Sequence, residues 1–139
     1  MLKGKKIIKL FCGSHHCFAI SNSGVIYGWG LNTSGQLALK DRENRNSPHE
    51  IEYFKGKHVI NIISGYYHSL FICENGEIYS CGGNHLGQLG LGNDQEEYLT
   101  PQAVFYKSKN IIELSSGSVH LLALSSFILF YLIFFIRKR

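Results

Sequence analysis

An internal repeat of 52 residues is the strongest constraint that this sequence places on its fold. Residues 3–39 align with residues 55–91 without a gap, and a third copy begins at residue 107. The positions that recur are Gly13/Gly65/Gly117, His16/His68/His120, Gly24/Gly76, Gly30/Gly82 and Gly35/Gly87. A period of this length is typical of a solenoid, a propeller or another repeat array.

Within each copy the local pattern is that of short β-strands. Apolar runs such as "IIKLF" and "VINII" are rich in β-branched residues, and the residue between their aliphatic positions varies freely. We expect one buried face formed by Ile8 and Leu10, Ile60 and Ile62, and Ile112 and Leu114. Ser23-Gly24 and Asn75-Gly76 each separate two further runs, which predicts hairpins with type I′ turns. Three to four short strands per copy favour a propeller blade over a helical solenoid.

The stretch "FCGSHHCFAI" gathers Cys12, His15, His16 and Cys17, which suggests a zinc site, a redox pair or a nucleophile with its base. The repeat argues against all three, because only His16 recurs in the other copies and a zinc site needs four ligands together. We therefore expect Cys12 and Cys17 to be small residues at strand positions. The N-terminus has no secretory signal pattern, so the four cysteines are expected to be reduced, in the cytoplasm or nucleus.

The pattern G-x-N-x-x-G-Q-L occurs in "GLNTSGQLAL" and "GGNHLGQLGLGN", and "GYYHSLFICENG" follows the first of them at a distance. These motifs resemble the repeat of the regulator of chromosome condensation family over about residues 3–125. The resemblance implies a seven-bladed β-propeller of four-stranded antiparallel sheets, in which the recurring glycines and G-x-x-H histidines are structural. The structural positions so assigned are Gly13, His16, Gly24, Gly30, Gly35, Gly65, His68, Gly76, Gly82, Gly87, Gly117 and His120.

The fold class that we expect is all-β, a partial propeller of about two and a half blades with an apolar tail. The repeats, with copies starting near residues 3, 55 and 107, would occupy 1–125 and the tail 126–139. Because so few blades cannot close a ring, the chain is expected to be a fragment or to complete the ring with other chains.

The C-terminal segment 119–136 is strongly apolar and ends at the basic run Arg137-Lys138-Arg139. A membrane-spanning helix needs about 20 apolar residues with charged flanks. Residues 119–124 already belong to the third copy, however, which leaves only residues 127–136 as new apolar sequence. Three interpretations stay open: a truncated or artefactual end, a membrane tail, and a further strand.

No catalytic constellation is found in the sequence. "GQLGLGND" lacks the Gly-Lys-Ser/Thr end of a phosphate-binding loop, and the acids Glu52, Asp94, Glu96 and Glu97 fall in loops. We expect a non-enzymatic interaction module with a protein partner and no cofactor, metal or small-molecule substrate. The family resemblance implies, further, regulation of a Ran-like small GTPase by guanine nucleotide exchange.

Two alternatives remain for the function. One is a membrane-tethered adaptor that displays the repeats through residues 119–136. The other is association with chromatin, for which the basic footprint is thin: the net charge is +4, and Lys3, Lys5, Lys6 and Lys9 crowd one end.

Overall fold

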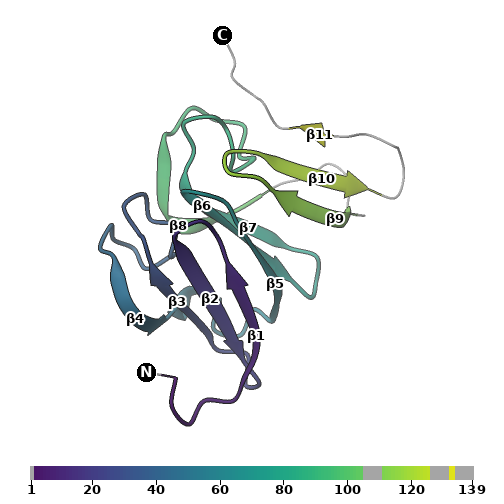
Figure 1. The fold of residues 1–139 in the computed structure, drawn as a ribbon. Coiled ribbons are helices and arrows are strands. Elements are labelled where there is room, and N and C mark those ends of the chain that lie inside the picture. The colour runs from purple at the N-terminus through teal and green to yellow at the C-terminus, as the bar shows by residue number, and fades with distance from the viewer. Residues whose placement is uncertain (1, 105–110, 126–131, 134–139) are drawn as a thin grey trace.

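Two four-stranded antiparallel sheets and the start of a third form the computed structural model, which describes residues 2–104, 111–125 and 132–133 (Figure 1). The first sheet holds, in order, β1 (Ile7–Cys12), β2 (His16–Ser21), β3 (Ile26–Gly30) and β4 (Arg45–Glu50). The second holds β5 (Val59–Ser64), β6 (His68–Cys73), β7 (Ile78–Gly83) and β8 (Glu97–Ala103). The third holds β9 (Ile111–Ser116), β10 (Leu121–Ser125) and β11 (Leu132–Ile133), in the order β11-β10-β9. The expected all-β fold is confirmed.

The three sheets contact one another through their first strands: β1 lies beside β5, and β5 lies beside β9. The core between the first two sheets gathers side chains from both, including Phe18, Leu37, Ile62 and Phe71. The rings of Phe18 and Phe71 meet edge to face with their centroids 5.3 Å apart. The 3-10 helix η1 (Glu52–Phe54), which links the two sheets, adds Phe54 to this core.

A second, smaller cluster lies on the other side of the second sheet. Leu70, Ile78 and Val104 are buried there, and the partly buried Leu114 of β9 packs against them. The second sheet is therefore packed on both faces, which is the arrangement expected of a blade inside a propeller.

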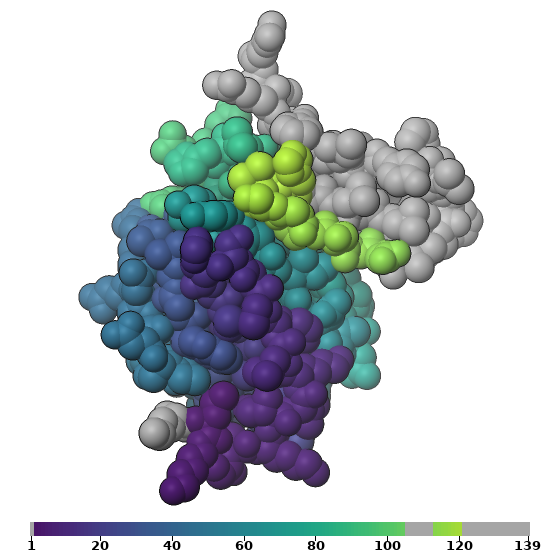
Figure 2. All heavy atoms as spheres, viewed as in Figure 1, coloured from purple at the N-terminus to yellow at the C-terminus, as the bar shows by residue number. Residues whose placement is uncertain are grey.

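The predicted buried face of the first strands is only partly correct. Ile62 is 3% exposed and Leu114 is partly buried, but Leu10, at the position equivalent to Ile62, is 66% exposed. The segment that holds β1 lies uncovered at the surface (Figure 2, purple). Apolar and polar residues alternate around Leu10 as they do in a half-buried strand. No described segment, however, packs on that face of the first sheet.

The prediction also fails at Ile8 and Ile60, which are both exposed. The register with the neighbouring strand shifts between Ile7 and Lys9, and again between Val59 and Asn61. A bulge of this kind inserts one residue, so Val59 turns into the core in place of Ile60. The side chain of Ile112 lies outside the described residues.

The predicted type I′ turns are wrong, although the glycines lie where they were expected. Gly24 and Gly76 have φ of 79° and 83°, but Asn75 is not among the residues with positive φ. The Gly76 amide donates to the Cys73 carbonyl at 3.0 Å, and the Cys73 amide donates to the Glu77 carbonyl at 2.8 Å. This is a three-residue hairpin connection that ends in a left-handed glycine, which needs one positive φ instead of two.

No helix in the described ranges is long and apolar enough to cross a membrane. The described part of the tail is β11, which pairs with β10 through Leu122–Ile133 and Ala123–Leu132. Most of the tail, on which the three interpretations of residues 119–136 depend, lies outside the described residues. The division into repeats over 1–125 and a tail over 126–139 stays a prediction.

Candidate interaction site

Each G-x-x-H segment closes a hairpin between the first two strands of its sheet. In all three copies the glycine amide donates to the histidine carbonyl: Gly13 to His16 at 2.8 Å, Gly65 to His68 at 2.9 Å and Gly117 to His120 at 3.0 Å. The three-residue offset is thus the span of one tight turn. The recurrence that was found in the sequence corresponds to a recurrent turn geometry.

The first two of these histidines reach across to the next sheet. The Nε2 atom of His16 lies 2.8 Å from the Oγ atom of Ser69, and the Nε2 atom of His68 lies 2.8 Å from the Oγ atom of Ser116. Ser69 pairs with Ser64 across β5 and β6, while Ser116 pairs with Leu121 across β9 and β10. Each histidine therefore contacts the first residue pair of the next hairpin.

Both histidines are buried and neutral. Burial, with smaller contributions from His68 and His15, lowers the pKa of His16 to about 4. Burial likewise lowers the pKa of His68 to about 4, with a further contribution from His120. Among the described residues the Nδ1 atoms of His16 and His68 have no hydrogen-bond partner, so a second proton on either ring would be buried without compensation. We interpret both as structural residues.

Two of the recurring glycines are required by close contacts. A β-carbon on Gly65 would lie 2.0 Å from Cε1 of His68, so the histidine ring occupies the space of a side chain. Gly82 has φ of 104°, and a β-carbon there would lie 2.2 Å from the Tyr67 carbonyl oxygen. At the equivalent positions of the first copy, a β-carbon on Gly30 would meet the His15 carbonyl oxygen, and one on Gly13 would lie 2.7 Å from the Gly65 carbonyl oxygen. The glycine at Gly117 has more room, with the nearest His120 atom at 3.6 Å.

The G-x-N-x-x-G-Q-L motif builds the loop between the third and fourth strands. Asn32 is fully buried; its Oδ1 accepts from the Leu37 amide at 2.8 Å and its Nδ2 donates to the Asp41 carbonyl at 2.9 Å. Asn84 repeats this with Leu89 and Gln95. The glycines Gly35 and Gly87 lie in these loops with positive φ. The sequence revealed this motif but not that its asparagine replaces missing backbone hydrogen bonds.

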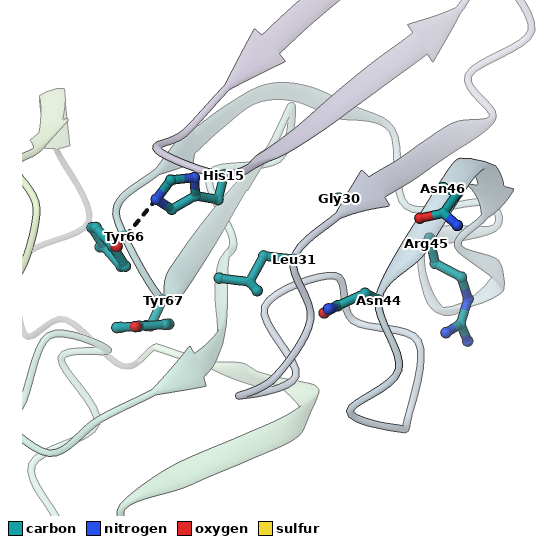
Figure 3. A pocket seen from close by; sticks show the side chains of 8 residues that line it. All are labelled: His15, Gly30, Leu31, Asn44, Arg45, Asn46, Tyr66 and Tyr67. Atoms are coloured by element: carbon teal, nitrogen blue, oxygen red, sulfur yellow. Dashed lines mark hydrogen bonds between the residues drawn. The ribbon is translucent and has the colours of Figure 1, made fainter.

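A pocket of about 480 Å³ opens where the hairpin turns of the first two sheets meet (Figure 3). We call it the turn pocket; it is lined by His15, Gly30, Leu31, Asn44, Arg45, Asn46, Tyr66 and Tyr67. His15 comes from the turn between β1 and β2, and the two tyrosines come from the equivalent turn between β5 and β6. Of the predicted structural positions, Gly30 alone lines the pocket.

The aromatic side of the turn pocket is held by ring contacts. The Nε2 atom of His15 lies 3.1 Å from the Tyr66 hydroxyl, with the two rings edge to face at 5.0 Å. The centroids of Tyr66 and Tyr67 are 4.5 Å apart. Tyr67 nevertheless remains 40% exposed. His15 and Tyr67 stand at equivalent positions of the first two copies. This difference within an otherwise regular repeat is the sequence signal that could have revealed the site.

On the polar side of the turn pocket, hydrogen bonds hold the side chains in place, and the positive charge of Arg45 is paired with a carboxylate. The Arg45 guanidinium donates to the Asp41 carboxylate at 2.6 Å and to the Glu43 carbonyl at 2.6 Å. The Asn44 Oδ1 atom accepts from the Asn32 amide at 2.8 Å. Within the described residues, no group of three or more histidine, cysteine, aspartate or glutamate side chains could hold a metal ion.

Two family models of the regulator of chromosome condensation (RCC1) repeat match the chain. One matches residues 23–72 and 75–124, and the other matches residues 7–36 and 59–88. Among curated proteins, the ultraviolet-B receptor UVR8 of Arabidopsis thaliana is 30% identical over 122 residues, which are 88% of this chain and 28% of the receptor. The probable E3 ubiquitin-protein ligase HERC3 of Homo sapiens is 30% identical over 88% of this chain and 12% of the ligase. The RCC2 homolog of Xenopus laevis is 33% identical over 84% of this chain and 23% of its own.

Solved structures agree with the fold. The structure of Prp20p from Saccharomyces cerevisiae, described together with its binding properties to Gsp1p and histones, matches with a TM-score of 0.78 at 23% identity. That match covers 86% of this chain and 31% of Prp20p. Human WBSCR16 matches with a TM-score of 0.77 at 19% identity, over 88% of this chain and 31% of its own. The expected partial β-propeller is thereby confirmed, and the chain spans less than a third of the length of these relatives.

Proposed function

Because the chain belongs to the regulator of chromosome condensation repeat family, we propose that it is a protein-interaction module whose turn pocket forms part of the partner-binding surface. The expected family is confirmed by the two repeat families that match. The observation that carries the proposal is an aromatic centre, partly exposed and held in place, beside polar side chains at the meeting point of two blades.

The composition of the turn pocket is that of a protein interface. Tyrosine and arginine are enriched in the buried centres of interfaces, and tyrosine supplies a large contact area at little cost in conformational entropy. The Tyr66 ring is already packed against Tyr67 and against His15, so little further ordering is needed on binding. The ion pair of Arg45 with Asp41 compensates the local charge, so binding there should depend only weakly on salt.

The partner class that we propose is a small GTPase of the Gsp1p kind, with guanine nucleotide exchange as the finer function. Its support is the likeness to Prp20p, whose structure is described with its binding to Gsp1p and histones. Relatives named as a receptor and as a ligase show that the repeat is used in proteins of different kinds. We further propose a nuclear or cytoplasmic location, and binding without catalysis by the described residues.

Titration of the purified chain with fluorescently labelled Gsp1p·GDP tests the proposal, and purified histones provide a second titration. Tyr67→Ala is expected to weaken binding about tenfold or more, as for a central aromatic residue at an interface. Leu86→Ala is the matched control, since Leu86 is also 40% exposed but does not line the pocket. Faster release of GDP would support exchange in addition to binding.

Equal affinities for the wild type and both variants would exclude the turn pocket as the binding surface. Absence of binding in both titrations would contradict the proposed partner classes.

A further inference from the structure

The first hairpin brings two thiols together. The Sγ atoms of Cys12 and Cys17 lie 2.9 Å apart, and the two residues are direct partners across β1 and β2. From the sequence we expected two unrelated small residues at strand positions. Recurrence between the copies does not reveal a pairing that occurs in a single copy.

The backbone register suits a bond between these sulfurs. The Gly13 amide donates to the His16 carbonyl at 2.8 Å, so Gly13–His16 is a hydrogen-bonded pair and Cys12–Cys17 is a non-hydrogen-bonded pair. In such pairs the α-carbons are about 4.5 Å apart and the side chains are close together. A disulfide spans α-carbons about 4.4–6.8 Å apart with sulfurs about 2.0 Å apart, so only a small movement of the sulfurs is needed.

The two thiols differ from the other cysteines in their access to solvent. Cys12 is exposed and Cys17 is half-buried, whereas Cys73 and Cys81 are buried. Burial and the contact with Cys12 raise the pKa of the Cys17 thiol to about 11. Cys12 is therefore the residue that a soluble oxidant reaches first, and Cys17 is the residue that reacts in the second step.

The same register in the second sheet holds two hydroxyls. Ser64 and Ser69 are partners across β5 and β6, at the positions equivalent to Cys12 and Cys17. This place therefore holds two hydroxyls in the second copy and two thiols in the first. The turn that the pair would close also carries His15 into the turn pocket.

We propose that Cys12 and Cys17 form a reversible cross-strand disulfide, with a low-molecular-weight disulfide such as glutathione disulfide as the oxidant. The Cys12 thiolate attacks one sulfur of the oxidant; a mixed disulfide forms and one glutathione thiolate leaves. Cys17 loses its proton and attacks the Cys12 sulfur, and the second glutathione leaves. The two protein thiols lose two electrons and two protons, and the oxidant is reduced to two glutathione thiols.

The experiment equilibrates the whole chain in buffers of stated glutathione and glutathione disulfide concentration, then quenches with acid and alkylates the free thiols. Peptide mass mapping then measures the fraction with a Cys12–Cys17 bond. We expect this fraction to follow the ratio of the disulfide to the squared thiol concentration. The equilibrium constant should be at least about tenfold larger for the folded chain than for the chain in urea, because the fold already pairs the sulfurs. Cys73 and Cys81 should be alkylated only after unfolding.

Two measurements keep the proposal open to refutation. In Cys17→Ser no second thiol remains to attack the Cys12 sulfur, so glutathione is expected to stay attached to Cys12 as a mixed disulfide. In the wild type, oxidation should raise the urea midpoint of unfolding, since a bond favoured by the folded state favours that state in return. The proposal is overturned if the folded chain keeps both thiols reduced or carries glutathione on both, or if its equilibrium constant equals that in urea.

Discussion

The Nε2 atom of His68 lies 2.8 Å from the Oγ atom of Ser116, a residue 48 positions further along the chain and in the next sheet. His16 makes the equivalent contact with Ser69, 53 positions away, at the same distance. The joint between blades therefore combines an apolar core with a buried, neutral imidazole. This joint determines how the molecule should respond to mutation and to pH.

Gly65→Ala is expected to destabilise the fold by about 1–3 kcal/mol, the usual cost of overpacking, because its β-carbon would meet the His68 ring. In a His68→Ala background the ring is gone and the added cost should fall below about 1 kcal/mol. Urea unfolding of the four proteins measures this coupling. Additive effects of the two substitutions would show that the ring is not the cause.

Gly82→Ala and Gly76→Ala separate backbone strain from steric contact. Both glycines have positive φ, but a β-carbon has no neighbour within 4 Å at Gly76 and would collide with the Tyr67 carbonyl at Gly82. We expect a loss of about 1–2 kcal/mol for Gly76→Ala and a clearly larger loss for Gly82→Ala. Thermal and urea unfolding of each variant provide the comparison. Equal losses would mean that the backbone at Gly82 moves aside freely.

The stability should fall as the pH drops from about 7 towards 4. The pKa of His16 and of His68 is about 4 in the folded chain, against the ordinary histidine value of 6.5, so in this window the unfolded chain binds more protons. At pH 5 each histidine should cost about 2 kcal/mol relative to pH 8. The measurement is the urea midpoint at several pH values.

His68→Asn is the matching variant for this prediction. It should lower the stability at pH 8 but remove about half of the dependence between pH 5 and pH 8. The pKa values of Asp41 and Glu77 are both lowered, so these carboxyl groups add to the loss of stability only towards the acid end of the range. A pH dependence that is unchanged in both His68→Asn and His16→Asn would assign it to other groups.

Leu10→Ala and Ile62→Ala compare one repeat position in two surroundings. Ile62 is buried between sheets, so its truncation should cost about 2–5 kcal/mol, whereas that of the exposed Leu10 should cost less than about 0.5 kcal/mol. Unfolding curves at two protein concentrations test this. A large, concentration-dependent loss at Leu10 would mean that another molecule covers the open face of the first sheet.

The repeat made much of this fold predictable from sequence. The offset of 52 residues aligned the strands of one copy with those of the next. The recurring glycines and histidines identified the turns, because turns depend on local geometry. The burial of Leu10 could not be predicted in this way. Alternation shows which face of a strand is apolar, but burial also requires a neighbouring sheet on that face.

The candidate sites were less predictable because they depend on pairing. The turn pocket joins His15 to Tyr66 and to the start of β4, which are far apart in the sequence. The Cys12–Cys17 contact depends on the register of one hairpin, and the choice of Ser69 or Ser116 by each histidine depends on its cross-strand neighbour. None of these is visible from the spacing of residues alone.

The paired positions that face each histidine make the joint tolerant of sequence drift. In the second sheet the hydroxyl that meets His16 belongs to Ser69, and in the third, where Leu121 stands at that place, Ser116 meets His68 instead. The hydroxyl that meets the imidazole can thus come from either position of the cross-strand pair. Duplicated blades can diverge in sequence at this position and still stack in the same way.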